Sequence, residues 1–205
     1  MCRVRIVTVA VLFAALASVA QARRKDPEYA NSADDQKLRS GIMALAPGID
    51  PEEGLRVTQI AFNTGRDLKK EWRVVWPPGL QNFLVHTGQR KGGLCFQFAE
   101  RLLWRLSAQN WNTVEFHWAE SFETTPAEHN VIVVTAKGQN FYRGIILDNW
   151  RYGGHLVWGP VLDDLHYRWH ENKAQFQKVV NRRPVPSVSP NAAPAGPSSS
   201  TAETR

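Results

Sequence analysis

Three residues of this chain have the types and the order of a thiol-nucleophile site. Cys95 follows a glycine pair, His129 opens an apolar run, and Asp148 closes a later one. In such a site the cysteine attacks a carbonyl carbon, the histidine accepts and later returns the proton, and the carboxylate orients the imidazole. The candidate catalytic residues are therefore Cys95, His129 and Asp148.

The surroundings of Cys95 favour a reactive thiol. From Leu94 to Leu106 the apolar residues recur every three or four positions, which predicts a helix that begins beside the cysteine. A thiol at a helix N-terminus faces the positive end of the helix dipole, which favours the thiolate. The unpaired backbone N–H groups of that first turn can donate to an oxyanion. Gln89, six residues upstream, is the candidate side-chain donor to the same oxyanion, and Gln97 is a weaker candidate.

The spacing of His129 and Asp148 fits two paired strands. Residues 131–136 are β-branched and apolar on both faces, as in a covered strand, and residues 141–147 predict a second strand after a turn at Gly138. A hairpin centred on that turn places His129 directly opposite Asp148, with Cβ atoms about 5 Å apart. A shift of one residue would send the two side chains to opposite faces of the sheet.

Other residues are expected to contact the substrate or to form the core. Gly92 and Gly93 let a substrate backbone approach Cys95 closely. Trp150, two residues beyond Asp148, is expected to shield the His–Asp contact and to bind substrate. Five further tryptophans are expected mainly in the core, or else along a sugar- or peptide-binding cleft: Trp104, Trp111, Trp118, Trp158 and Trp169.

The elements that must position these residues change type along the chain. Helical segments are expected over residues 39–75 and 94–106, and strands over 114–118, 131–136, 141–147 and 156–158. Helices first and a meandering sheet second indicate an α+β fold. We expect N-terminal helices, with the nucleophile-bearing helix packed on an antiparallel sheet.

The N-terminus has the pattern of an export signal. Arg3 and Arg5 precede an apolar stretch over 6–19, and Ala20-Gln21-Ala22 is a typical cleavage sequence. The expected organisation is a signal peptide over 1–22, a polar leader over 23–38, one domain over 39–180 and a disordered Pro/Ser/Ala-rich tail over 181–205. Such a protein is periplasmic or secreted, without a stable membrane span after cleavage.

Composition narrows the function classes. The chain has 205 residues, 43% of them hydrophobic, and a net charge of +6 that is scattered rather than clustered. Nucleic-acid binding is therefore not expected, and a negatively charged wall polymer is a more suitable neighbour. Cys2 would leave with the signal, so no intramolecular disulfide can form. His166 and His170 would share a helix face as zinc ligands, but no third ligand is suitably spaced, so no metal or other cofactor is expected.

Three segments resemble the papain-like and transglutaminase-like cysteine-protease superfamily, and most of all its bacterial transglutaminase-like cysteine proteinases. These are Gly93-Leu94-Cys95 with Ala99 one turn later, His129-Asn130-Val131-Ile132-Val133-Val134, and Ile145-Ile146-Leu147-Asp148-Asn149-Trp150. The resemblance implies acyl-transfer chemistry: proteolysis, amide hydrolysis, deamidation or transamidation. Gln89 is similar in position to the oxyanion glutamine of papain-like enzymes. Phe96-Gln97 lacks the acidic residues found beside the cysteine in periplasmic members, so calcium dependence is not implied.

The sequence therefore predicts an exported thiol hydrolase or amidase acting on peptide or isopeptide amides. Its substrate would be a peptide, a protein or a cell-wall peptide. A deamidase or transglutaminase-type transferase would use the same groups. The alternative from another class is a non-catalytic periplasmic or surface binding module in which Cys95 is an ordinary core thiol.

Overall fold

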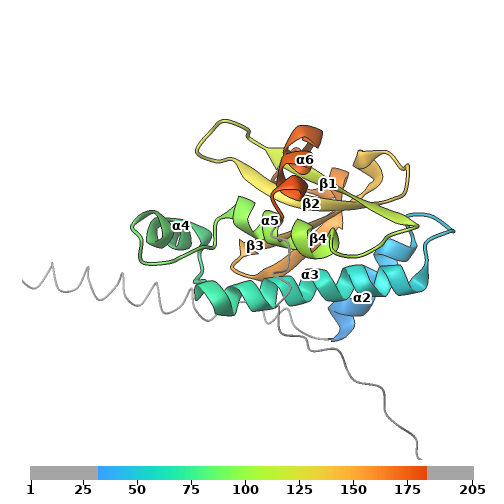
Figure 1. Cartoon of the computed structure of the whole chain (residues 1–205), viewed down its shortest axis with the longest axis horizontal. Helices are drawn as coiled ribbons and strands as arrows, with labels where there is room; N and C mark the ends of the chain where they lie inside the picture. The colour runs from blue at the N-terminus through green and yellow to red at the C-terminus, as the bar shows by residue number, and fades with distance from the viewer. Residues whose placement is uncertain (1–31, 184–205) are drawn as a thin grey trace, which may run out of the picture.

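The structure is a computed structural model that describes residues 32–183 (Figure 1). The expected signal peptide over 1–22, and residues 184–205 of the expected tail, lie outside the described residues. The helices are α2 (Ser32–Met43), α3 (Pro51–Trp72), α4 (Pro78–His86), α5 (Cys95–Leu106) and α6 (Lys173–Asn181). The strands are β1 (Val114–Ser121), β2 (His129–Ala136), β3 (Ile145–Tyr152), β4 (His155–Pro160) and β5 (His170–Glu171), with short 3₁₀ turns η1 (Phe141–Arg143) and η2 (Val161–Asp163).

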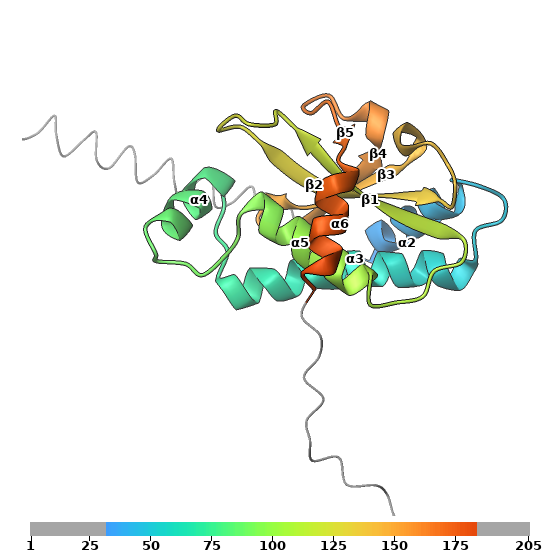
Figure 2. The same ribbon diagram turned by 45° about the horizontal axis from the view of Figure 1, so that its top comes forward.

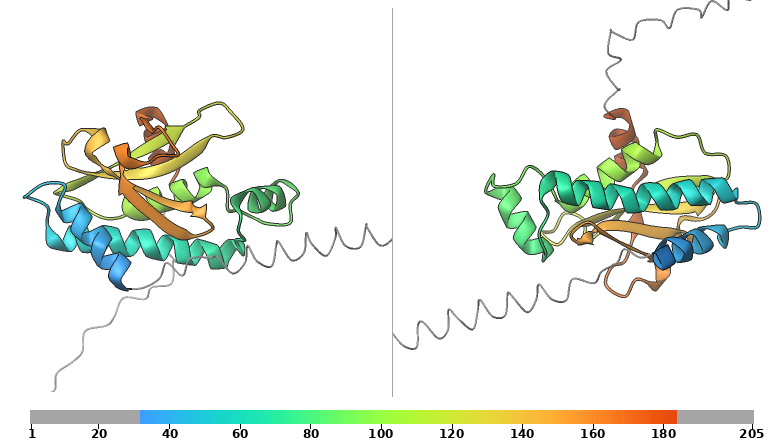
Figure 3. Two further views of the ribbon diagram at one scale, coloured as in Figure 1. Left: turned by 180° about the vertical axis from the view of Figure 1, so that it is seen from behind. Right: turned by 90° about the horizontal axis from the view of Figure 1, so that it is seen from below.

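The fold is α+β, as expected. The strands form one antiparallel sheet in the order β4-β3-β2-β1-β5. The long helix α3 runs beneath the sheet, with α2 toward one end of the molecule and α4 at the other (Figure 3). Helix α6 lies beside α5 and β1 (Figure 2).

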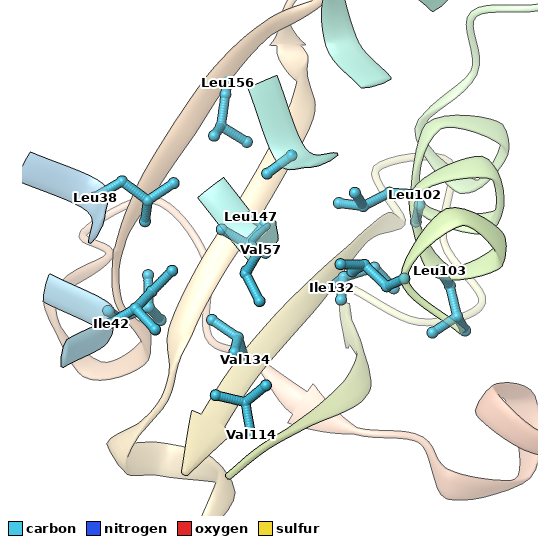
Figure 4. Packing of buried hydrophobic residues seen from close by; sticks show 14 of the residues in the cluster. Leu38, Ile42, Val57, Leu102, Leu103, Val114, Ile132, Val134, Leu147 and Leu156 are labelled. Atoms are coloured by element: carbon cyan, nitrogen blue, oxygen red, sulfur yellow. The ribbon is translucent and has the colours of Figure 1, made fainter. Parts of the chain in front are cut away.

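One face of the sheet packs on the helices and makes the main core. Leu102 and Leu103 of α5 point toward Ile132 of β2, while Leu38 and Ile42 of α2 approach from the other side (Figure 4). All five side chains are at most 1% exposed. This packing fixes α5, and with it Cys95, against the central strand.

The opposite face of the sheet is covered by a smaller apolar cluster. Val131 and Val133 of β2 pack there with Phe141 of η1, Val161 of η2 and Trp169. Every residue of β2 is therefore buried, as the apolar pattern over 131–136 indicated.

Residues at or near the N-termini of α3 and α5 account for where these two helices begin. Asp50 accepts a hydrogen bond from the Glu52 N–H at 2.8 Å, and Pro51 occupies the first helical position of α3. At the start of α5, the Gln97 side-chain oxygen accepts from the N–H groups of Gly93 and Leu94 at 2.9 and 3.0 Å. The chain immediately before Cys95 is therefore held by a residue of the helix itself.

Several sequence-based expectations differ from the structure. The polar leader ends early, because residues 32–38 already belong to α2 and Leu38 is buried. The strand expected over 141–147 starts only at Ile145, because Asn140 caps a 3₁₀ turn over Phe141–Arg143. His166 and His170 share no helix, since His166 lies in a loop and His170 in β5. Helices α4 and α6 were not anticipated, and the domain continues to the end of α6 at Asn181.

None of the helices in residues 32–183 combines the length and the apolar character that crossing a membrane requires.

Candidate active site

His129 and Asp148 form a buried pair at the centre of the site. The Nε2 atom of His129 lies 2.8 Å from Oδ2 of Asp148, and both side chains are only 1% exposed. His129 is the first residue of β2, and Asp148 lies in the middle of β3. The expected contact between these two residues is therefore present, buried between neighbouring strands.

The strand register that produces this contact is not the expected one. Ile132 pairs with Leu147, and Val134 with Ile145, so the same register places Asp148 opposite Val131. The direct pairing of His129 with Asp148 was wrong by two residues. Because side chains alternate with a period of two, a shift of two leaves both on the same face as diagonal neighbours.

Asp148 is held ionised by several donors. Its Oδ2 atom accepts from Arg151 Nε at 3.0 Å, and Oδ1 accepts from the backbone N–H of Trp150 at 2.9 Å and of Arg151 at 3.1 Å. Burial would raise the pKa of Asp148, but the charges and hydrogen bonds of His129 and Arg151 hold it at about 2. The carboxylate can therefore only accept hydrogen bonds at neutral pH.

This charge state fixes the direction of the hydrogen bond between His129 and Asp148. Because Asp148 only accepts, Nε2 of His129 must be the donor in their contact. Burial alone would lower the pKa of His129, but Asp148 outweighs it and, together with the nearby Cys95 thiol, raises the pKa to about 9. The second nitrogen, Nδ1, is buried and makes no hydrogen bond within the described residues.

Cys95 supplies the thiol beside this imidazole. It is the first residue of α5, is partly exposed, and is the free cysteine of the described residues. Its Sγ atom lies 3.6 Å from the carbonyl oxygen of Glu128, immediately before His129. Since Nε2 of His129 is taken by Asp148, Nδ1 is the atom left to exchange a proton with the Cys95 sulfur. The three residues expected from sequence thus come together.

Aromatic rings enclose the imidazole. The ring centroids of Trp150 and Tyr167 each lie 4.7 Å from that of His129, and that of Trp169 lies at 5.4 Å. Trp150 therefore shields His129, as expected, and its buried Nε1 makes no hydrogen bond within the described residues. Such walls keep water away and strengthen the His–Asp interaction.

A second carboxylate fixes this aromatic cover. Asp164 accepts from Arg151 Nη2 at 2.7 Å and from the Trp169 indole Nε1 at 3.1 Å. The Arg151 guanidinium also lies 4.7 Å from the centroid of the Tyr167 ring. Arg151 therefore ties the loop before β5 to Asp148, and through it to His129.

The expected glutamine donors are engaged elsewhere. Gln89 is exposed, and its side-chain amide donates to the Thr87 hydroxyl at 3.2 Å. Gln97 holds the chain before α5, as described above. The structure therefore gives neither side chain an oxyanion role, and Cys95 keeps only the backbone N–H groups of the helix start from the expected set.

The glycine pair is needed for packing rather than left open to substrate. A Cβ on Gly92 would lie 2.7 Å from a ring carbon of Trp72, and one on Gly93 would lie 2.6 Å from Nε2 of Gln81. Gln81 is fully buried and bridges Val75 N and Gly92 O at 3.0 and 2.8 Å. The expectation that these glycines admit a substrate backbone is therefore replaced by close contact within the protein.

A pocket of about 420 Å³ is lined by residues that contact the His–Asp pair, although His129 and Cys95 do not line it themselves. Part of its wall is formed by Tyr167, which contacts His129, and by Arg151, which contacts Asp148. The other wall includes Trp76 and Phe122, which are 37% and 50% exposed. Open aromatic side chains beside a reactive group are typical of a binding pocket.

The other tryptophans mostly belong to the core. Four of the five tryptophans expected there donate their indole N–H to an acceptor within the protein, at 2.7 to 3.1 Å. These four are Trp104, Trp111, Trp118 and Trp169. In residues 32–183 no group of three or more His, Cys, Asp or Glu side chains is arranged to hold a metal ion.

Comparison with family models, with curated proteins and with solved structures gives no match for this chain. The site therefore has to be interpreted from its own geometry. Sequence reasoning missed Arg151, Tyr167 and Asn130 as parts of it. The signal that the sequence offered was proximity along the chain: Arg151 lies three residues after Asp148, Tyr167 two residues before Trp169, and Asn130 directly after His129.

Proposed function

We propose that this protein is a thiol-dependent hydrolase or amidase that transfers an acyl group through Cys95. The observation that carries the proposal is the state of His129. Its Nε2 donates to Asp148 at 2.8 Å, while its Nδ1 is buried without a hydrogen bond beside the Cys95 thiol. A buried polar atom costs free energy unless it is satisfied, so an unpaired Nδ1 next to a thiol is a marker of function.

The reaction would proceed in two stages. In the reacting form the proton of Cys95 resides on Nδ1 of His129, and the sulfur attacks the carbonyl carbon of the substrate as a thiolate. His129 then protonates the leaving amine, and a thioester with Cys95 remains. In the second stage His129 takes a proton from water, which attacks the thioester and releases the acid. Asp148 keeps the imidazole in one tautomer throughout.

The protonation state of His129 suits this mechanism. Because the pKa of His129 is about 9, the imidazolium persists at neutral pH. A positive charge beside a sulfur favours the thiolate, which is the nucleophilic form. The resting enzyme would therefore hold a thiolate–imidazolium pair. Asp148 stabilises this positive imidazole from behind, and Arg151 in turn holds the Asp148 carboxylate.

We base the substrate class on the sequence together with this site. We infer a peptide or isopeptide amide in an exported setting, periplasmic or secreted, with a protein or cell-wall peptide as its source. A scaffold of the papain-like or transglutaminase-like type would accommodate this chemistry. If an amine rather than water attacks the thioester, the same residues perform transamidation.

Cys95→Ala tests the proposal directly. With p-nitrophenyl acetate as the probe, the native protein should gain one acetyl group on Cys95 by intact mass, and C95A should gain none. The melting temperature of C95A should stay unchanged, because Cys95 is partly exposed and bonds only weakly. A native protein that is neither acetylated nor labelled by iodoacetamide near neutral pH would instead be a binding module, for which the exposed aromatic pocket provides the surface.

A further inference from the structure

Asn130 carries a side-chain amide whose orientation is fixed by its neighbours. It follows His129 in β2 and is 4% exposed. Its Oδ1 accepts from the Trp118 indole N–H at 2.9 Å. An indole N–H can only donate, so the oxygen of the amide must face Trp118 and the NH₂ group must point the other way.

The NH₂ group faces Cys95. Nδ2 of Asn130 lies 3.1 Å from Oε1 of Glu128 and 3.9 Å from Sγ of Cys95. One N–H therefore donates to the Glu128 carboxylate, and the other is directed at the sulfur. Because Asn130 and His129 are consecutive in a strand, they leave β2 on opposite faces and approach the thiol from different sides.

The surrounding network keeps this donor in place. Trp118 is buried in the core and also donates to Glu120, the cross-strand partner of Asn130, at 3.0 Å. Glu120 in turn accepts from Asn172 at 2.8 Å. A donor fixed before substrate arrives costs no reorganisation when negative charge develops.

We infer that the Asn130 side-chain amide, together with the backbone N–H of Cys95, stabilises the oxyanion formed when Cys95 is acylated. This inference rests on the proposed function. The oxyanion is bonded to the carbon that Sγ attacks, so it lies two bonds from the sulfur and within reach of a donor 3.9 Å from Sγ. Asn130 takes the role that the sequence had assigned to Gln89.

The step has a simple chemical balance with p-nitrophenyl acetate. The Cys95 thiolate forms an S–C bond, and the carbonyl π electrons move to oxygen, where Asn130 would donate. Collapse of this intermediate restores the carbonyl and expels p-nitrophenolate, leaving the acetyl thioester. Alkylation by iodoacetamide displaces iodide directly and creates no oxyanion, so it measures only the reactivity of the thiolate.

The experiment compares these two rates in the native protein and in Asn130→Ala. Removing one oxyanion donor costs about 100-fold or more in rate, so acetylation should fall by about that factor while alkylation changes by less than about 5-fold. Asn130→Asp is the second variant, because it keeps an acceptor for Trp118 and loses the N–H donor. Asn63→Ala, at an exposed position of α3, is the matched control and should change neither rate.

Each outcome is decisive. Equal acetylation rates in the native protein and both Asn130 variants, or acetylation and alkylation falling by the same factor in Asn130→Ala, would overturn the oxyanion role. Failure of the native protein itself to be acetylated would overturn the proposed function as well, and the two failures are thus distinguishable. A selective loss of acetylation in both variants supports Asn130.

Discussion

His129 and Asp148 meet at 2.8 Å although they are not directly opposed in the sheet. Their contact is diagonal, and it is completed from the far side by Arg151, whose Nε lies 3.0 Å from the same carboxylate oxygen. A single Asp148 oxygen therefore receives both the imidazole and the guanidinium. This shared oxygen, the packing around Cys95 and the pocket beside Tyr167 each have consequences that can be measured.

The His129–Asp148 pair should make stability depend on pH at both ends. The pKa of His129 rises from 6.5 to about 9 on folding, so its stabilisation is complete below pH 6.5 and is lost as pH rises through about 9. The pKa of Asp148 falls from 3.8 to about 2, so its stabilisation is complete above pH 3.8 and is lost as pH falls toward 2. Urea unfolding should thus show the pair's full contribution between these limits.

The matched variant for this measurement is Asp148→Asn, which keeps the shape and removes the charge. Its free energy of unfolding should vary less between pH 6.5 and about 9 than that of the native protein. If both proteins lose the same stability across that interval, the pair does not titrate as described.

Arg151→Gln should weaken both stability and acylation. The substitution removes a guanidinium that contacts two buried carboxylates, and an uncompensated buried charge costs about 3 to 5 kcal/mol. The pKa of Asp148 should rise, which moves the acid limb of the acetylation rate to higher pH. Thermal melts and pH–rate profiles measure the two effects.

Arg105→Gln is the control for this variant. Arg105 also pairs with an aspartate, Asp67 at 2.7 Å, but that side chain is 53% exposed. An exposed pair contributes less than about 1 kcal/mol. Equal effects of R105Q and R151Q would show that burial of the Arg151 contacts is unimportant.

Gly93→Ala should disturb the approach to Cys95. Gly93 has φ +119°, and an added Cβ would lie 2.6 Å from Gln81, which two hydrogen bonds hold in place. We expect a loss of about 2 kcal/mol or more in the free energy of unfolding, and slower alkylation of Cys95. Gly48→Ala, which has nothing within 4 Å of the new Cβ, should change stability by less than about 0.5 kcal/mol. Similar losses for the two variants would contradict this account.

The aromatic pocket should select large apolar side chains. Inactivation by an N-acetyl-phenylalanine chloromethyl ketone should be about 10-fold faster than by the alanine analogue, because the phenyl ring can bury itself between Trp76 and Phe122. Phe122→Ala should reduce this preference. Phe83→Ala removes a ring that is 59% exposed on α4 and serves as the control. An unchanged preference in F122A would place recognition elsewhere.

The sequence by itself determined the types of the elements that carry the site. The three-and-four apolar spacing after Leu94 predicted α5 beginning at Cys95, and the unbroken apolar run predicted a strand buried on both faces. These are local properties, because the spacing of apolar residues within one segment shows whether it forms a helix or a strand and which of its faces are buried. The order of Cys95, His129 and Asp148 was enough to predict that these three residues belong to one site.

Tertiary structure decided how those residues meet. The 3₁₀ turn at Phe141–Arg143 moved the strand register by two, and only the even value of that shift kept His129 and Asp148 on one face. The roles of Asn130 and Arg151 depend on partners far along the chain or on the opposite side of a strand. A hydrogen bond between distant segments leaves no period in the sequence, so only the tertiary structure could show that the Asn130 amide faces Cys95 while Gln89 contacts Thr87.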